Sequence, residues 1–186
     1  YRIVEELGRG GMAVVYGAVR SGEGGFNRLV ALKFLSPRLL EEPRFVQMFL
    51  DECRIAAHLH HPNIVQVYEL GRVGSDHFIA MEWVNGTDII QYCQVRQLNL
   101  TERLKLFMDI LAAVQFAHQH LVIHGDIKPT NILVNEEGQV KLLDFGIARL
   151  LRSEEPELTA HSVGYLTPEQ SREHSAITTA TDIHQL

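Results

Sequence analysis

Five residues suited to chemistry rather than to packing lie close together in the stretch VIHGDIKPTN (residues 122–131). They follow a short run of Val and Ile and are His124, Gly125, Asp126, Lys128 and Asn131. Asp126 is an acid that could accept a proton, Lys128 is a cation, and the amide oxygen of Asn131 is a possible metal ligand. A surface turn could use Gly-Asp and Pro-Thr-Asn merely to reverse the chain, so the neighbouring motifs must decide between the two interpretations.

A second acid follows an apolar segment in the stretch LLDFG (residues 142–146). Asp144 comes directly after the apolar residues and is followed by a Phe and a flexible Gly. Carboxylate oxygens at the end of a strand suit a hard cation such as Mg²⁺, which prefers one or two carboxylates together with phosphates. Asp144 therefore favours the chemical interpretation of the stretch 122–131.

A glycine-rich segment, GRGGMAVVY (residues 8–16), lies between two predicted strands. Glycines allow the backbone to approach a phosphate and to direct N–H groups at it, although a plain glycine hairpin is equally consistent with this segment. A dinucleotide-binding turn would require a helix after the glycines. The following VVYGAV is rich in β-branched residues and predicts a strand, so the dinucleotide interpretation fails.

Two charged residues occupy otherwise apolar faces. Lys33 lies within the apolar strand VALKFL, and Glu52 falls on the apolar face of the predicted helix 43–62. Either charge is costly to bury alone, and the two together explain one another as an ion pair. The alternative for Lys33 is an edge-strand side chain that points to solvent.

The elements that must position these residues fall into a strand-rich first part and a helical second part. In the first part the sequence predicts strands over 1–7, 14–19, 28–35, 64–70 and 77–84, with the helix 43–62 between the third and the fourth. A turn is expected at NGTD (residues 85–88), within a connector near 82–88.

The second part begins with a helix from Thr101, which we expect Thr101 itself to cap. Its predicted apolar stripe consists of Leu104, Phe107, Leu111, Val114, His118 and Leu121. Strands are predicted over 131–135 and 139–144, flanking the turn EEG, and the segment 145–177 is polar and irregular. The stretch 122–131 thus lies at the end of the long helix.

Composition excludes several classes of protein. The chain has 186 residues, of which 46% are hydrophobic and 22% charged, and its formal charge is -6, so no nucleic-acid surface is expected. No apolar run suggests a membrane segment, and no signal peptide opens the chain. Two cysteines are too few for a disulfide framework, which fits a cytoplasmic protein, although a longer parent could be membrane-tethered. Because the first residue is Tyr1 and not Met, we expect the chain to be a piece of something longer.

Taken in order, these motifs resemble those of a protein kinase, and more specifically the bacterial, eukaryotic-type serine/threonine kinases. The glycine-rich segment, VALK, HGDIKPTN, DFG and TPE (residues 167–169) are similar to the family's motifs, and HPNIV, MEWVNG and YLTPEQ resemble the bacterial branch. The resemblance implies an α+β, bilobal kinase fold over residues 1–186. It would comprise a β-rich N-terminal lobe with one helix (1–84) and a mainly helical, C-terminally incomplete lobe (85–186).

The resemblance also implies a reaction: transfer of the ATP γ-phosphate to Ser or Thr hydroxyls of a protein substrate, with Mg²⁺ as cofactor. Asp126 would accept the hydroxyl proton, Lys128 would steady the phosphoryl group, and Asn131 and Asp144 would hold the metal. Lys33, paired with Glu52, would grip the ATP phosphates. The implied nucleotide site consists of Leu7, Gly8, Arg9, Gly10, Gly11, Met12, Ala13, Val14, Val15, Ala31, Lys33, Met81, Glu82, Val84, Asp88 and Leu133.

Some positions depart from the family pattern. Gly125 replaces the arginine that usually precedes the catalytic Asp and that meets a phosphate on the activation segment, so we expect substantial activity without that phosphorylation. His124 is expected to serve as a packing and hydrogen-bonding scaffold for the loop. Asp182, in the terminal TDIHQL, resembles the acid that anchors the loop backbone, and the apolar face of its helix would be exposed. The alternative function is a pseudokinase or nucleotide-binding scaffold without transfer activity.

Overall fold

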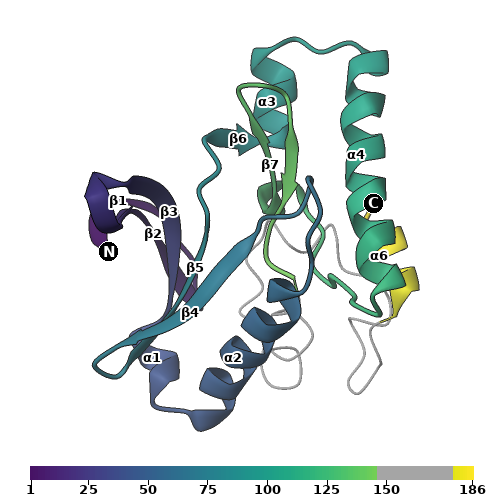
Figure 1. The fold of residues 1–186 in the computed structure, drawn as a ribbon. Coiled ribbons are helices and arrows are strands. Elements are labelled where there is room, and N and C mark those ends of the chain that lie inside the picture. The colour runs from purple at the N-terminus through teal and green to yellow at the C-terminus, as the bar shows by residue number, and fades with distance from the viewer. Residues whose placement is uncertain (146–177) are drawn as a thin grey trace. The chain divides into compact units, whose positions relative to one another are not determined.

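A computed structural model of the chain describes residues 1–145 and 178–186, apart from the side chains of Met48 and Glu52. The chain divides into two compact units, and Figure 1 labels most of their helices and strands. The first unit consists of Tyr1–His58 and Gln66–Trp83, and the second unit consists of Leu59–Val65 and Val84–Leu186. Each unit has a sheet and a hydrophobic core of its own.

A five-stranded antiparallel sheet forms most of the first unit. In the spatial order β1-β2-β3-β5-β4, its strands are β1 (Arg2–Arg9), β2 (Ala13–Ser21), β3 (Asn27–Leu35), β5 (Asp76–Glu82) and β4 (Val67–Val73). The strands predicted over 1–7, 14–19, 28–35 and 77–84 are confirmed. The strand predicted over 64–70 begins only at Val67, because the N–H of Val65 donates to the carbonyl of Leu142 (3.0 Å) in the second unit.

Two hydrophobic clusters cover the two faces of this sheet, since side chains alternate along each strand. One cluster lies within the sheet itself and consists of Ala18, Val30, Leu32, Phe78 and Ala80. The other joins the sheet to helix α2 (Pro43–Ala57), which follows the short helix α1 (Pro37–Leu40) and lies beside β4 (Figure 1), and consists of Leu35, Phe49, Cys53 and Ile79. Lys33 is two residues before Leu35 and therefore belongs to the face that α2 covers.

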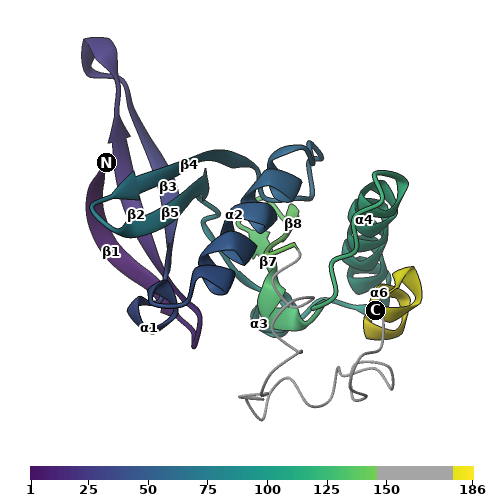
Figure 2. The same cartoon turned by 90° about the horizontal axis from the view of Figure 1, so that it is seen from below.

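The second unit combines helices with a three-stranded antiparallel sheet, seen from below in Figure 2. Its helices are α3 (Ile89–Val95), α4 (Leu100–Gln119) and α6 (Thr179–Gln185), and a 3₁₀ turn spans Pro129–Asn131. The sheet has the order β6-β7-β8, with β6 at Gly86–Asp88, β7 at Ile132–Asn135 and β8 at Val140–Leu142. None of the helices in the described ranges combines the length and the apolar character that crossing a membrane requires.

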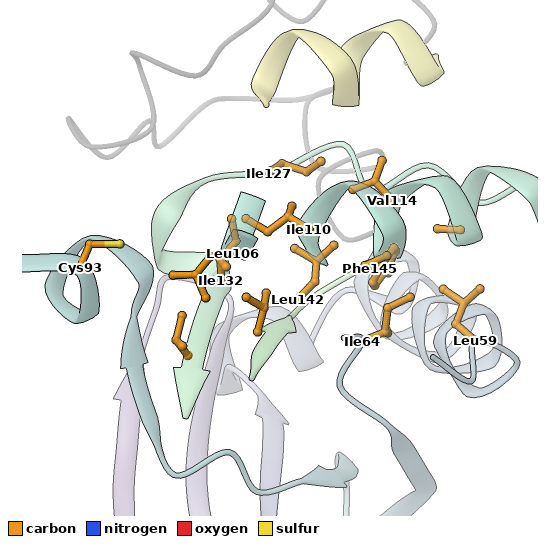
Figure 3. Packing of buried hydrophobic residues seen from close by; sticks show 14 residues of the cluster. Leu59, Ile64, Cys93, Leu106, Ile110, Val114, Ile127, Ile132, Leu142 and Phe145 are labelled. Carbon is orange, nitrogen blue, oxygen red and sulfur yellow. The ribbon is translucent and has the colours of Figure 1, made fainter. Parts of the chain in front are cut away.

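A single cluster of buried apolar side chains joins these elements (Figure 3). The cluster consists of Leu59, Ile64, Cys93, Leu106, Ile110, Ala113, Val114, Ala117, Ile127, Ile132, Val134, Val140, Leu142 and Phe145. It includes Ile127 from the stretch 122–131 and Phe145 from the DFG motif. Ile127 follows Asp126 and Phe145 follows Asp144, so each of the two acids has an apolar neighbour in the core.

The cap predicted for the long helix is wrong, and its predicted apolar stripe is correct only in part, at Val114 in the core and Phe107 packed against it. Asn99, not Thr101, caps α4, in a reciprocal arrangement in which Asn99 accepts from the Glu102 N–H (3.1 Å) and the Glu102 carboxylate accepts from the Asn99 N–H (2.8 Å). The residues that α4 buries are Leu106, Ile110, Ala113, Val114 and Ala117.

Within the predicted stripe only Val114 is fully buried, while Leu104 is 51% exposed and Leu121 is 94% exposed. The helix carries apolar residues on more than one side, including Met108, which is 62% exposed. Spacings of three and four therefore fit several stripes and do not identify the one that faces the core.

The predicted turn at residues 85–88 is instead the strand β6, which pairs with β7. Gly86 makes this pairing possible, because a Cβ atom at that position would lie 2.4 Å from the backbone oxygen of Val134. The helix α3 that follows was not predicted. Asp88 begins it as the N-cap, its carboxylate accepting from the Gln91 N–H at 3.0 Å. Of the segment predicted to be irregular, residues 146–177 lie outside the described residues.

Candidate active site

The loop between α4 and β7 contains the residues first singled out in the sequence, and it turns at Gly125. Gly125 has φ = 75°, in the left-handed region that a residue with a Cβ atom adopts only with strain. The loop then leads through Lys128 into the 3₁₀ turn Pro129–Asn131 and into β7. The glycine that replaces the family's arginine therefore occupies a position whose backbone conformation favours glycine.

Asp182 of α6 anchors this loop, as the sequence predicted. Its carboxylate is completely buried and accepts backbone hydrogen bonds from the N–H of His124 (2.9 Å) and the N–H of Gly125 (2.6 Å). His118, near the end of α4, donates from Nε2 to the same carboxylate at 2.7 Å. Three donors thus compensate a buried negative charge, and the loop is held against both α6 and α4.

The expected scaffold role of His124 is confirmed by its hydrogen bonds. Its ring is 1% exposed; Nδ1 accepts from the N–H of Asp126 at 3.2 Å, and Nε2 lies 2.7 Å from the carbonyl of Leu143. Because a carbonyl can only accept, Nε2 carries the proton and Nδ1 does not, which is the neutral form of the ring. The ring also contacts the Phe145 ring, with centroids 4.7 Å apart.

Asp126, Lys128 and Asn131 form one connected group. The Asp126 carboxylate pairs with the Lys128 ammonium at 2.8 Å, and both side chains remain partly exposed. The amide nitrogen of Asn131 donates to the backbone oxygen of Asp126 (2.8 Å) and to its carboxylate (3.0 Å). Because that nitrogen faces Asp126, the amide oxygen of Asn131 is directed elsewhere, as a metal ligand requires.

Asp144 is positioned by the segment just before it. The N–H of Leu143 donates to the backbone oxygen of Asn131 at 2.9 Å, and the Leu143 carbonyl accepts from His124. Asp144 itself has φ = 56°, a left-handed conformation that is uncommon outside glycine and that recurs at functional sites. The described residues thus bring Asp126, Lys128, Asn131 and Leu143 into one hydrogen-bonded group, with Asp144 adjacent in the chain.

Oxygen donors of this kind fit the implied Mg²⁺ ion. The amide oxygen of Asn131 and the carboxylate of Asp144 are hard ligands, and Mg²⁺ typically takes one or two protein ligands and completes its shell with phosphates and waters. No cluster of three or more His, Cys, Asp or Glu side chains able to hold a metal ion occurs within residues 1–145 and 178–186. A site made of one carboxylate, one amide and substrate oxygens requires no such cluster.

In the first unit, most residues of the implied nucleotide site lie on the β1–β2 hairpin and on β3. The Gly10 N–H donates to the Ala13 carbonyl at 2.9 Å, which closes the glycine-rich loop between β1 and β2. Val15 of β2 pairs in register with Lys33 of β3, and Ala31 pairs with Met81 of β5. Lys33 is only 4% exposed, which excludes the alternative of an edge-strand lysine pointing to solvent.

The other predicted nucleotide-site residues are divided between the two units. The N–H of Glu82, at the end of β5, donates to the Gln66 carbonyl at 2.8 Å. Asp88, a member of the implied nucleotide site, uses one carboxylate oxygen to cap α3. Val84 follows β5 and belongs, with Leu133 of β7, to the second unit.

The family model for the protein kinase domain matches residues 1–186 of this chain. The chain belongs to the protein kinase family. It is 41% identical to a probable serine/threonine-protein kinase, PknB, of Lactococcus lactis over all of the chain and 30% of that protein. It is 37% identical to a tyrosine-protein kinase, MasK, of Myxococcus xanthus over 92% of the chain and 29% of that protein. The chain thus spans less than a third of the length of these curated relatives.

A solved structure supports the same fold. The crystal structure of the PknI kinase domain of Mycobacterium tuberculosis matches with a TM-score of 0.64 and 33% sequence identity, covering 78% of this chain and 59% of that one. The predicted α+β, bilobal kinase fold, present here in part, is therefore confirmed.

Two residues that hold the loop were not predicted as site residues. His118 was assigned to an apolar stripe, and Gln185 of α6 was not singled out, although its side chain bonds to the backbone of residues 125 and 127. A signal existed for Gln185, because it lies three residues after Asp182 and therefore on the same face of a helix.

Burial lowers the pKa of His124 below its ordinary value, and this effect outweighs the charges of Asp182, Asp126 and Asp144, which favour protonation. As pH falls below about 6.5, the His124 imidazole takes up a proton in the unfolded chain before it does so in the folded chain. The contribution of His124 to folding stability is therefore complete above that pH and is lost below it. We expect the free energy of unfolding to fall between pH 7.5 and 5.5, with His124 contributing at most about 1.4 kcal/mol per pH unit.

Urea unfolding at several pH values, with the full-length protein and its His124→Gln variant, measures this contribution. Glutamine can offer one acceptor and one donor but does not titrate. The variant is expected to be less stable at pH 7.5 and to show a shallower pH dependence. Parallel pH profiles for the two proteins would contradict the assignment.

Proposed function

We propose that this chain is the larger part of the catalytic domain of a serine/threonine protein kinase, which transfers the γ-phosphate of ATP to a Ser or Thr hydroxyl of a protein. The observation that carries the proposal is the group formed by Asp126, Lys128 and Asn131 on a loop whose backbone is fixed by Asp182. Residues 1–84 and 85–186 would contribute the N-terminal lobe and part of the C-terminal lobe. Cys53 and Cys93 are both buried, and a chain with only two cysteines suits the reducing cytoplasm.

In the proposed reaction, the substrate hydroxyl oxygen bonds to the γ-phosphorus of ATP as the bond from that phosphorus to the β–γ bridging oxygen breaks. The Asp126 carboxylate orients the hydroxyl and takes up its proton, and ADP leaves. Lys128, 2.8 Å from Asp126, would neutralise charge on the transferring group. Because phosphoryl transfer requires little covalent chemistry from the protein, position and charge account for most of the rate.

Asn131 and Asp144 would hold Mg²⁺, which when bound neutralises charge on the ATP phosphates. The two residues are positioned by different contacts. Asn131 is oriented by its bonds to Asp126, and Asp144 follows Leu143, which bonds to Asn131 and His124. The loop therefore positions the metal ligands and the proton acceptor together.

The loop itself must indicate the class of hydroxyl acceptor, since the names of the relatives include both serine/threonine and tyrosine kinases. Lys128 stands two residues after Asp126, where the resemblance to serine/threonine kinases places a lysine. Its ammonium lies beside the Asp126 carboxylate, close to where a substrate hydroxyl would be oriented. We therefore propose Ser and Thr as the acceptors.

Asp126→Asn in the full-length protein is expected to lower phosphoryl transfer by about 10²–10⁴-fold, because asparagine cannot accept the hydroxyl proton. ATP binding should persist, since the nucleotide contacts proposed for the first unit are unchanged. The measurements are transfer from γ-labelled ATP to a generic protein substrate, identification of the labelled amino acid, and ATP affinity.

Glu137→Gln is the matched control, because Glu137 is an exposed acid in the turn between β7 and β8. It should leave transfer unchanged. Near-normal transfer by the Asp126→Asn protein would refute the catalytic assignment. A wild-type protein that binds ATP but transfers no phosphate would establish the scaffold alternative, and label on tyrosine alone would overturn the proposed acceptor.

Lys33 and Glu52 are proposed to form the ion pair that positions the ATP phosphates. The support is the burial of Lys33 and its place on the face of the sheet that α2 covers, with Phe49 and Cys53 of α2 packed against that face. Lys33→Met and Glu52→Gln should each reduce kcat/KM. The double variant should lose less than the sum of the two losses in free energy, because partners that act together are not additive.

A double-mutant cycle on the full-length protein gives this coupling directly. Lys105→Met, which removes an exposed lysine of α4, is the control for loss of a positive charge. Strictly additive losses would mean that the two side chains do not act as a pair.

A further inference from the structure

Gln185, the last residue of α6, is 7% exposed and directs its side-chain amide at the catalytic loop. Its Oε1 accepts from the N–H of Ile127 at 2.9 Å, and its Nε2 donates to the carbonyl of Gly125 at 3.4 Å. Figure 3 shows α6, in yellow, beside the part of the loop that carries Ile127. One side chain therefore bonds to the loop immediately before and immediately after Asp126.

The two peptide groups that flank Asp126 contain four polar atoms, and side chains satisfy all four. Gln185 binds the Gly125 carbonyl and the Ile127 N–H. His124 accepts from the Asp126 N–H at 3.2 Å, and Asn131 donates to the Asp126 carbonyl at 2.8 Å. The backbone on both sides of the Asp126 Cα atom is thereby fixed, with Gln185 supplying two of the four partners.

We propose that Gln185 is a positioning residue for Asp126: its amide holds the two peptide groups around the catalytic acid in the orientation that aims the carboxylate at the substrate hydroxyl. The inference rests on the proposed function of Asp126 and deepens it. Gln185 touches neither substrate nor ATP in this role and acts only through the backbone of residues 125–127.

Both ends of the amide are needed for this role. Ile127 is 2% exposed, so its N–H has no access to water if Gln185 cannot accept from it, and an unsatisfied buried donor favours a rotated peptide. A carboxylate at position 185 could accept from Ile127 but would face the Gly125 carbonyl with a second acceptor. Asp182 fixes only the N–H groups of His124 and Gly125, on one side of Asp126. Gln185 therefore supplies the restraint from α6 on the other side.

The test compares Gln185→Met and Gln185→Glu with His184→Gln, a change on the exposed side of the same helix, all in the full-length protein. Methionine keeps the length without the polar atoms, and glutamate keeps the size and the acceptor but loses the donor. The melting temperature of each variant is measured first. Steady-state transfer with varied ATP and hydrogen exchange of the Ile127 amide are then measured below the lowest of these temperatures. The glutamate variant keeps the test available if the methionine variant does not fold.

We expect both Gln185 variants to lower kcat by about tenfold or more while the KM for ATP stays within about threefold of wild type. The Ile127 amide should exchange faster in Gln185→Met, and His184→Gln should behave as wild type in every measurement. An unchanged kcat, a loss confined to the KM for ATP, or an equal loss in His184→Gln would overturn the proposal. If the wild-type protein transfers no phosphate, it is the proposed function that fails. In that case hydrogen exchange still tests Gln185, because an Ile127 amide that stays protected in Gln185→Met would refute its role.

Discussion

The buried carboxylate of Asp182 is the interaction on which the rest of the candidate active site depends. It is fully removed from solvent, and a charge in that position is costly unless several donors surround it. The N–H groups of His124 and Gly125 and the Nε2 of His118 supply those donors. Because these groups lie 57 to 64 residues away along the chain, the carboxylate fixes the loop to both α4 and α6.

Around this anchor, each group in the loop positions the next. The N–H groups of His124 and Gly125 both donate to Asp182, and Gly125 then turns the chain in a left-handed backbone conformation. His124, held neutral by burial, accepts from Asp126 and donates to Leu143, and so connects the loop to the segment that precedes Asp144. A dense hydrogen-bonded loop of this kind loses little entropy when substrate binds, which is how position lowers the barrier of phosphoryl transfer.

Short runs of β-branched and apolar residues predicted β2 and β3, and the order of the motifs predicted the kinase fold, because both signals lie within short segments of the sequence. The anchor Asp182 was predicted from its motif. Gln185 was not, since a polar side chain is assigned to solvent unless its partners, here 58 residues away for Ile127, are known. The buried face of α4 was mispredicted because Leu104 and Leu106 fit equivalent spacings, and only the elements packed against the helix select one.

Amide hydrogen exchange in the full-length protein and in its Asp182→Asn variant tests the central role of this carboxylate most directly. Asparagine keeps the shape but replaces one acceptor oxygen with an N–H₂ group that must face another donor. We predict rapid exchange of the His124 and Gly125 amides in the variant, together with a loss of about 3–5 kcal/mol in the free energy of unfolding. Amides that remain as protected as in the wild-type protein, with unchanged stability, would contradict the account.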